Sequence, residues 1–74
     1  MNFKNEREIA ESAVETAIDQ QDMYESLTKA FESYEENAID TAREYGFDLS
    51  DTSDWFYTVA EQLGYSKEVH AIGS

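Results

Sequence analysis

The sequence contains no cysteine, no proline, three glycines and one histidine. Without cysteine the chain forms no disulfide and offers no thiolate to a metal ion or to a nucleophilic reaction. No apolar run approaches the roughly 20 residues that cross a bilayer, and the first residues lack the apolar stretch of a signal peptide. We therefore expect a protein without membrane association that works in the cytoplasm.

Basic residues are equally scarce, since five Lys and Arg stand against 17 Asp and Glu, for a formal net charge of -12. The acids are spread along the whole chain rather than collected in a tail. High charge favours disorder, but the aromatic residues, 14% of the sequence, and a regular helical periodicity favour a folded chain. Such a surface should repel nucleic acid and anionic membranes and attract basic surfaces.

The longest helical pattern covers residues 23–45, which contain no glycine and no proline. Its apolar side chains recur at steps of three and four, which places them on one stripe of a helix. Gly46 follows where a C-terminal cap is expected. The stripe comprises Tyr24, Leu27, Phe31, Tyr34, Ala38, Ala42 and Tyr45.

Two further helices are predicted on either side of this one. The first runs from about residue 6 to 20, with Asn5 as its N-cap and an alanine-rich apolar face that another helix can approach closely. The third runs from about residue 52 to 63. The pair Asp51 and Asp54 resembles a capping box for it, and Ser50 or Ser53 offers an alternative cap.

The polar residues 20–22 separate the first helix from the second, so we place the second helix at about residues 22–45 with Asp22 as its cap. The alternative is one continuous helix from Glu6 to Tyr45, which would be unusually long for a small domain. Residues 66–74 are expected to be a flexible tail, a frayed turn or a short strand. The prediction is a single all-α domain over residues 1–74, with two longer antiparallel helices and a shorter third helix packed across them.

The aromatic residues divide into two groups on this pattern. Phe31 and Trp55 fall on apolar stripes, so we expect them in the core, where a small alanine-rich protein needs their bulk. Tyr57 and Tyr65 lie off the main stripe and are predicted to be exposed contact residues.

Catalytic and metal sites find little support in the sequence. Asp48, Ser50, Thr52 and Asp54 alternate as in a calcium-binding loop, but Ser53 and Val59 replace its diagnostic glycine and glutamate. His70 is the only histidine and has no metal-ligand spacing around it. No carboxylate falls inside an apolar stripe, where its pKa would rise for acid–base work. We therefore predict no metal, no cofactor and no enzymatic activity.

Acidic residues recur every three or four positions along the first two predicted helices, opposite the apolar stripes. Like charges at this spacing destabilise a helix by a few tenths of a kcal/mol per pair. This cost favours a binding surface over the alternative, a solvated face that only confers solubility. The predicted partner-binding residues are Glu8, Glu11, Glu15, Asp19, Asp22, Glu25, Glu32, Glu36 and Asp40.

With these rows, to which Glu35 and Glu44 also belong, the chain resembles the small acidic DNA-mimic proteins that phages and mobile elements direct against CRISPR effectors and restriction enzymes. The resemblance lies in charge, size and pattern and includes no signature motif, and Lys29 and Arg43 interrupt the second row. It implies a non-enzymatic inhibitor that binds a basic nucleic-acid-binding protein or complex, not nucleic acid itself. If a phage encodes the chain, the compartment is the cytoplasm of its host cell.

The alternative function is an acidic helical adaptor or assembly protein. In that reading the carboxylates serve solubility, and aromatic contacts join two copies into a homodimer. The two readings differ in salt dependence, because binding to a basic partner weakens steeply with salt, whereas apolar self-association does not.

Overall fold

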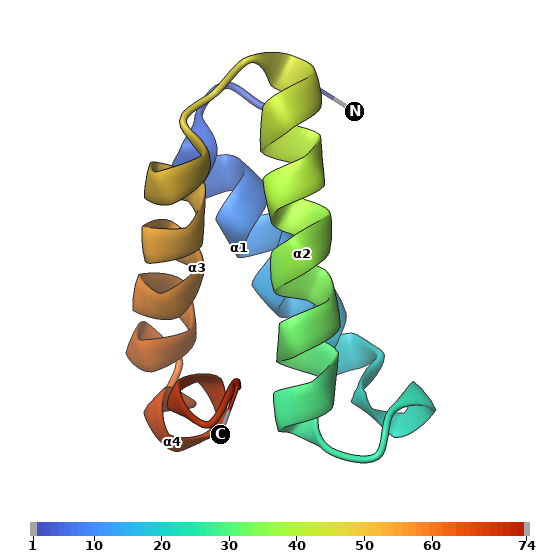
Figure 1. Cartoon of the computed structure of the whole chain (residues 1–74). Helices are drawn as coiled ribbons and strands as arrows, with labels where there is room; N and C mark the ends of the chain where they lie inside the picture. Colours follow the sequence, from blue (N-terminus) through green and yellow to red (C-terminus); the bar gives the residue numbers. More distant parts are fainter. Residues whose placement is uncertain (1, 74) are drawn as a thin grey trace.

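The computed structural model describes residues 2–73 and confirms the all-α prediction, since it contains no strand within that range. Figure 1 shows α2 and α3 side by side, with α1 crossing behind both and α4 folded against the end of α3. The elements are α1 (Glu6–Asp19), a 3₁₀ turn η1 (Gln21–Met23), α2 (Leu27–Tyr45), α3 (Leu49–Gln62) and α4 (Ser66–His70).

Two of the predicted caps are present. The Asn5 side chain accepts a hydrogen bond from the Glu8 N–H at 3.0 Å and so begins α1. Gly46 ends α2 with φ of 77°, a left-handed conformation that glycine adopts without steric cost. The Phe47 N–H then donates to the Ala42 carbonyl at 2.9 Å, which satisfies one of the free carbonyls of the last turn.

The break between the first two helices is confirmed, but the predicted start of the second was wrong. α2 begins at Leu27, and its cap is Ser26, whose hydroxyl oxygen accepts from the Lys29 N–H at 3.2 Å. Asp22 does not cap it, because Asp22 lies within η1. One continuous helix is therefore excluded, and residues 20–26 turn the chain back on itself.

The start of the third helix also differs from the prediction at residue 52. α3 begins at Leu49, where the Asp48 side chain accepts from the Asp51 N–H at 2.9 Å. Ser50 and Ser53 therefore lie inside the helix and cap nothing. Because of this earlier start, α3 has 14 residues, as many as α1.

The predicted tail contains a fourth short helix, so the expectation of a flexible or strand-like segment was wrong for residues 66–70. Val69 has no exposed surface, and the Glu68 carbonyl accepts a hydrogen bond from the Thr28 hydroxyl at 3.0 Å. These two contacts hold α4 against α2. Ser74, the last residue of the predicted tail, lies outside the described residues.

The core lies where α1, α2 and α3 meet. Phe31 and Phe56 are fully buried and pack edge to face, with ring centroids 5.8 Å apart. Alanines from α1 and α2 let these helices approach closely around the two rings. The buried apolar residues are Ile9, Ala10, Val14, Ala17, Ala30, Phe31, Ala38, Ala42, Phe56, Val59, Ala60 and Val69.

Three aromatic residues differ from their predicted positions. Trp55, predicted in the core, is only half-buried. Tyr57 and Tyr65, predicted to be exposed, are also half-buried, and the Tyr65 ring lies 6.0 Å from that of Phe31. For Tyr57 and Tyr65 the reason is α4, which packs against α2 and α3 and covers side chains that a three-helix pattern leaves open.

Candidate functional site

Four of the nine predicted binding residues lie together on one face of α1. Glu8, Glu11, Glu15 and Asp19 line a shallow open groove along this helix, and no Lys or Arg lines it within residues 2–73. Glu8 also serves the helix start, because its carboxylate accepts from the Lys4 N–H at 2.9 Å. Glu15 and Asp19 are exposed and form no ion pair with any described residue.

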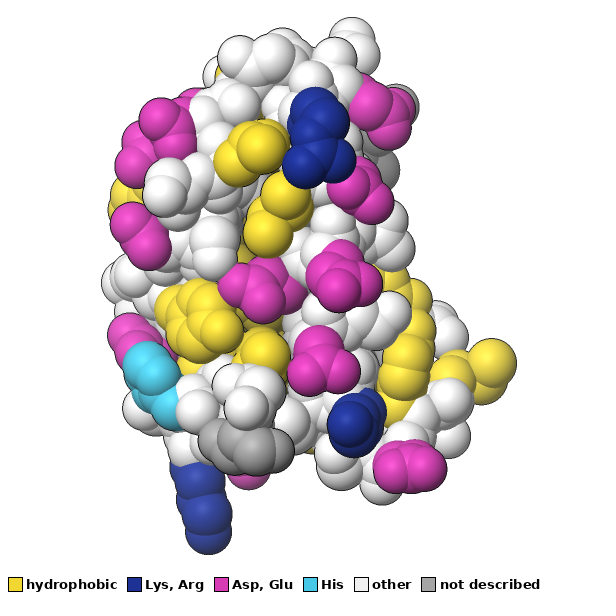
Figure 2. All heavy atoms as spheres, in the orientation of Figure 1, with side chains coloured by type: hydrophobic (Ala, Val, Ile, Leu, Met, Phe, Trp, Pro, Cys, Tyr) yellow, Lys and Arg dark blue, Asp and Glu magenta, His cyan; other side chains and the backbone are white. Residues whose placement is uncertain are grey.

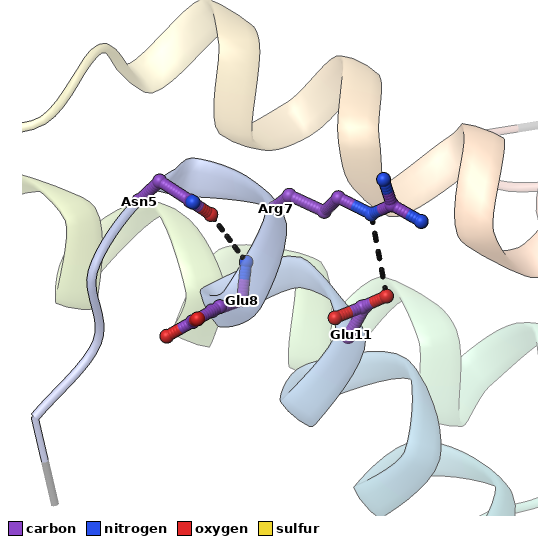
Figure 3. Close-up of polar contacts among 4 residues, drawn as sticks. All are labelled: Asn5, Arg7, Glu8 and Glu11. Atoms are coloured by element: carbon purple, nitrogen blue, oxygen red, sulfur yellow. Dashed lines mark hydrogen bonds and ion pairs between the residues drawn. The ribbon is translucent and has the colours of Figure 1, made fainter.

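Arg7 neutralises part of this face. Its guanidinium forms an ion pair with the Glu11 carboxylate (Figure 3), with an N–O distance of 3.3 Å. The same guanidinium stacks over the Trp55 ring, 4.9 Å from the ring centre. Both members of the ion pair remain about half exposed, at 52% and 43%. Solvent therefore screens the pair, and Glu11 can still interact with a second cation.

The predicted residues of the second helix lie one turn apart on α2. Glu36 and Asp40 are exposed, and Glu32 is half-buried. Asp40 pairs with Arg43 at 2.9 Å, with both side chains largely exposed. Figure 2 shows acidic side chains over both α2 and α3 on the face those helices form, interrupted by few basic ones.

The last two predicted residues lie outside the helices. Asp22 is in η1, and Glu25 precedes Ser26 in the link to α2; both are exposed. The helical periodicity of the sequence assigned one residue too many to each row, Asp22 to the first and Glu25 to the second. The reason is that it extended both helices into the turn between them. The row on α1 therefore has four carboxylates, and the row on α2 has three of those predicted.

A second hollow, of about 140 Å³, lies between α1 and α2 and shares Phe3, Ser12 and Thr16 with the acidic groove. Asn37 and Thr41 border it on the α2 side. Glu36 and Asp40 each precede one of these residues, about 100° further round the helix. Neither carboxylate lines the hollow, so the row on α2 lies on another face of that helix.

The sequence alone did not single out the small polar residues of this region. Ser12 and Thr16 border both the acidic groove and the hollow. In the sequence, however, each has the pattern of an ordinary solvent-facing residue of a helix. The available signal was their spacing, because both lie four residues apart next to the acidic row. Which face of α2 lies opposite them depends on helix packing and is not visible in the pattern.

Other acidic residues have structural contacts. The Glu6 carboxylate accepts from the Asp48 N–H at 3.0 Å, which ties the start of α1 to the start of α3. The Glu35 carboxylate accepts from the Ser53 hydroxyl at 2.7 Å and so joins α2 to α3. Glu61 contacts the ring of His70. These acids stabilise helix contacts and are less available to a partner.

The calcium-loop spacing has a structural explanation. Asp48 is the cap of α3, and the Asp48 carbonyl accepts from the Thr52 hydroxyl at 2.8 Å. Ser50 and Asp54 then lie on the helix rather than in a loop that could wrap around a cation. Within residues 2–73 no group of three or more His, Asp or Glu side chains is arranged to hold a metal ion.

Two tyrosines have perturbed acidity. Burial raises the pKa of the Tyr57 hydroxyl above its ordinary value, and the nearby Glu35 carboxylate raises it further. Burial likewise raises the pKa of Tyr34, and its neighbour Tyr24 adds to this effect. Both hydroxyls are therefore neutral near pH 7, and neither is activated as a nucleophile.

The chain matches no protein-family model, no curated protein and no solved structure. In the part of the chain that the structure describes, no helix has both the length and the apolar character needed to cross a membrane.

Proposed function

We propose that this protein is a non-enzymatic inhibitor that binds a basic nucleic-acid-binding protein or complex by imitating the phosphate charge of DNA. One observation carries the proposal. Four carboxylates line a single groove on α1, and no basic side chain of the described residues lines it with them. A CRISPR effector or a restriction enzyme is the proposed target, because such enzymes hold DNA in basic channels.

Charge density supports the comparison with DNA. The carboxylates of α1 follow one another every three or four residues, or about 4.5–6 Å along the helix axis. One strand of duplex DNA presents a phosphate about every 3.4 Å of axis. The row on α1 is therefore sparser than a DNA strand but of the same order.

Rigidity supports it as well. The carboxylates of both rows are attached to helices that pack on a common core, so their backbones do not become ordered on binding. Less conformational entropy is then lost when the protein docks. The net charge of -12 would also steer the protein towards a basic channel and speed association.

The adaptor reading has weaker support. It assigned self-association to Tyr57 and Tyr65, but both pack against the core and are half-buried. Among residues 2–73, the large apolar side chains that are exposed are Met23 in η1, Tyr45 at the end of α2 and Leu63 directly after α3, so they come from three different parts of the fold.

Charge reversal tests the proposal. In the double variant Glu15→Lys/Asp19→Lys, the α1 row loses the two carboxylates that have neither an ion pair nor a hydrogen bond to a described residue, while the core is untouched. Purified CRISPR effectors and restriction endonucleases would be assayed for DNA cleavage with each protein added. We expect the parent to inhibit a member of this panel in competition with DNA, and the variant to lose that inhibition by at least about tenfold, since close charge pairs couple by about 1.5–7 kcal/mol.

The matched control is Asp51→Lys/Asp54→Lys, which changes the net charge equally on exposed positions of α3. It should retain most of the inhibition. Equal inhibition by parent and α1 variant, or simultaneous binding of the target to DNA and to this protein, contradicts the proposal. In that case the carboxylates serve solubility.

A further inference from the structure

The hollow between α1 and α2 differs in chemistry from the acidic groove beside it. Ile9, Ala13 and Ala38 form its apolar floor, and Phe3 and Tyr34 add aromatic walls. No carboxylate of residues 2–73 lines it. Hydroxyl and amide side chains stand at its rim, so its mouth is polar while its floor is not.

The hollow and the groove form one continuous surface, because Phe3, Ser12 and Thr16 border both. A chain that lies along the carboxylates of α1 therefore passes the mouth of the hollow. The hollow measures about 140 Å³, close to the roughly 150 Å³ of a cavity that holds a benzene ring. One aromatic side chain fits this space.

We infer that the hollow receives a single aromatic side chain from a basic segment of the protein partner, while Lys and Arg of that segment pair with the α1 carboxylates. This inference rests on the proposed function and adds an apolar anchor to it. Such an anchor would let a protein distinguish its target from other basic surfaces, because DNA-like charge alone does not select among them.

The charge of the protein and of its surface indicates which of three possible occupants suits the hollow: a second copy of the chain, a basic side chain or an aromatic side chain. A second copy of this chain would bring its own net charge of -12 against the same row, so like charges would oppose its approach. An arginine or lysine head in the hollow would lose water without meeting a carboxylate. An aromatic side chain with basic neighbours satisfies both the apolar floor and the acidic border.

Two synthetic peptides test the inference directly. Both are rich in lysine and arginine; one carries a single tryptophan, and the other has alanine at that position. We expect the tryptophan peptide to bind the parent about tenfold or more tightly, from burial of its ring. The difference should persist as salt weakens both peptides, and NMR shifts on binding should be centred on Ala13 and Ala38.

Two variants fill the hollow from opposite walls. Ala13→Phe occupies it from α1, and Asn37→Phe occupies it from an exposed position on α2 that carries little risk to folding. Each should reduce the advantage of the tryptophan peptide to less than about twofold. Gln62→Phe, an exposed position on α3 that does not line the hollow, is the control and should retain the advantage.

The outcomes separate this inference from the proposed function. If both peptides bind the parent equally and both lose affinity for Glu15→Lys/Asp19→Lys, the acidic surface stands and the anchor is wrong. The anchor is also wrong if the tryptophan advantage survives both filling variants. If neither peptide binds the parent at low salt, the acidic surface and the anchor fail together.

Discussion

At the scale of single residues, Phe31 is the side chain on which the core depends most. It is fully buried, and its ring meets those of Phe56 and Tyr65 at 5.8 and 6.0 Å. It therefore joins α2 to α3 and to the residue that precedes α4. Trp55, also predicted in the core, packs against the edge of the core, retains exposed surface and lies under Arg7.

Phe31→Ala should lower the free energy of unfolding by about 3–5 kcal/mol, because it leaves a cavity beside the rings of Phe56 and Tyr65. A domain this small has little stability to lose, so the variant should be largely unfolded at room temperature by circular dichroism. Trp55→Ala should cost less, since part of that ring already faces water. Equal melting temperatures for Phe31→Ala and the parent would contradict the packing described above.

Tyr57 should make stability sensitive to alkaline pH. Its pKa is raised in the folded protein by burial and by Glu35, so the unfolded chain ionises first, near pH 10. The contribution of Tyr57 is thus complete below that pH and is lost as pH rises through its folded pKa. Tyr57→Phe should flatten the decline in melting temperature above about pH 10 relative to the parent. An unchanged decline would exclude this role.

At the scale of secondary-structure elements, the helix starts are set by single caps. Ser26 holds the first turn of α2 through the Lys29 N–H, whereas Asp22 lies in η1 without a capping bond. Ser26→Ala should lower the free energy of unfolding by about 1 kcal/mol, and Asp22→Ala should change it by less than about 0.5 kcal/mol. Urea denaturation of the two variants beside the parent measures both. A larger loss for Asp22→Ala would reverse the assignment.

The three long helices could be predicted from the sequence, but α4 and the first residues of α2 and α3 could not. Several residues that can cap a helix follow one another before α2 and again before α3, so local chemistry does not choose among them. The choice of Asp48 is made across the molecule, because its N–H donates to the Glu6 carboxylate at the start of α1. A contact between residues 42 positions apart leaves no local pattern.

Part of the candidate site could likewise be predicted from the sequence, and part could not. The acidic rows follow from helical periodicity, and the positions of Glu11, Glu15 and Glu36 on their helices were predicted correctly. The pairing of Glu11 with Arg7 also follows from their spacing of four. The hollow between α1 and α2 requires the way two helices face each other, and the periodicity of one helix contains no information on its neighbour.

At the scale of the whole molecule, a high net charge on a small body causes the carboxylates to repel one another. A net charge of -12 is carried on a body of 31 × 20 × 20 Å. The Debye length is about 30 Å at 10 mM salt and about 8 Å at 0.15 M. At low salt every charge therefore acts on every other, whereas near 0.15 M only neighbours interact.

Added salt should consequently stabilise the fold. The melting temperature should rise between about 10 mM and 0.15 M sodium chloride, as screening relieves the repulsion among the carboxylates. Glu15→Lys/Asp19→Lys, which makes the net charge less negative, should show a smaller rise. A melting temperature that falls with salt would mean that the few ion pairs outweigh the repulsion.

The short connections between the helices also bear on how quickly the fold forms. Residues 46–48 alone join α2 to α3, and most packed neighbours are consecutive in the chain. Closing such short loops costs little entropy, and helical proteins of low contact order fold within microseconds to milliseconds. With no proline there is no slow isomerisation of a prolyl bond. Refolding of these 74 residues after a rapid dilution from urea should therefore be one fast exponential, and a phase lasting seconds would point to association between chains.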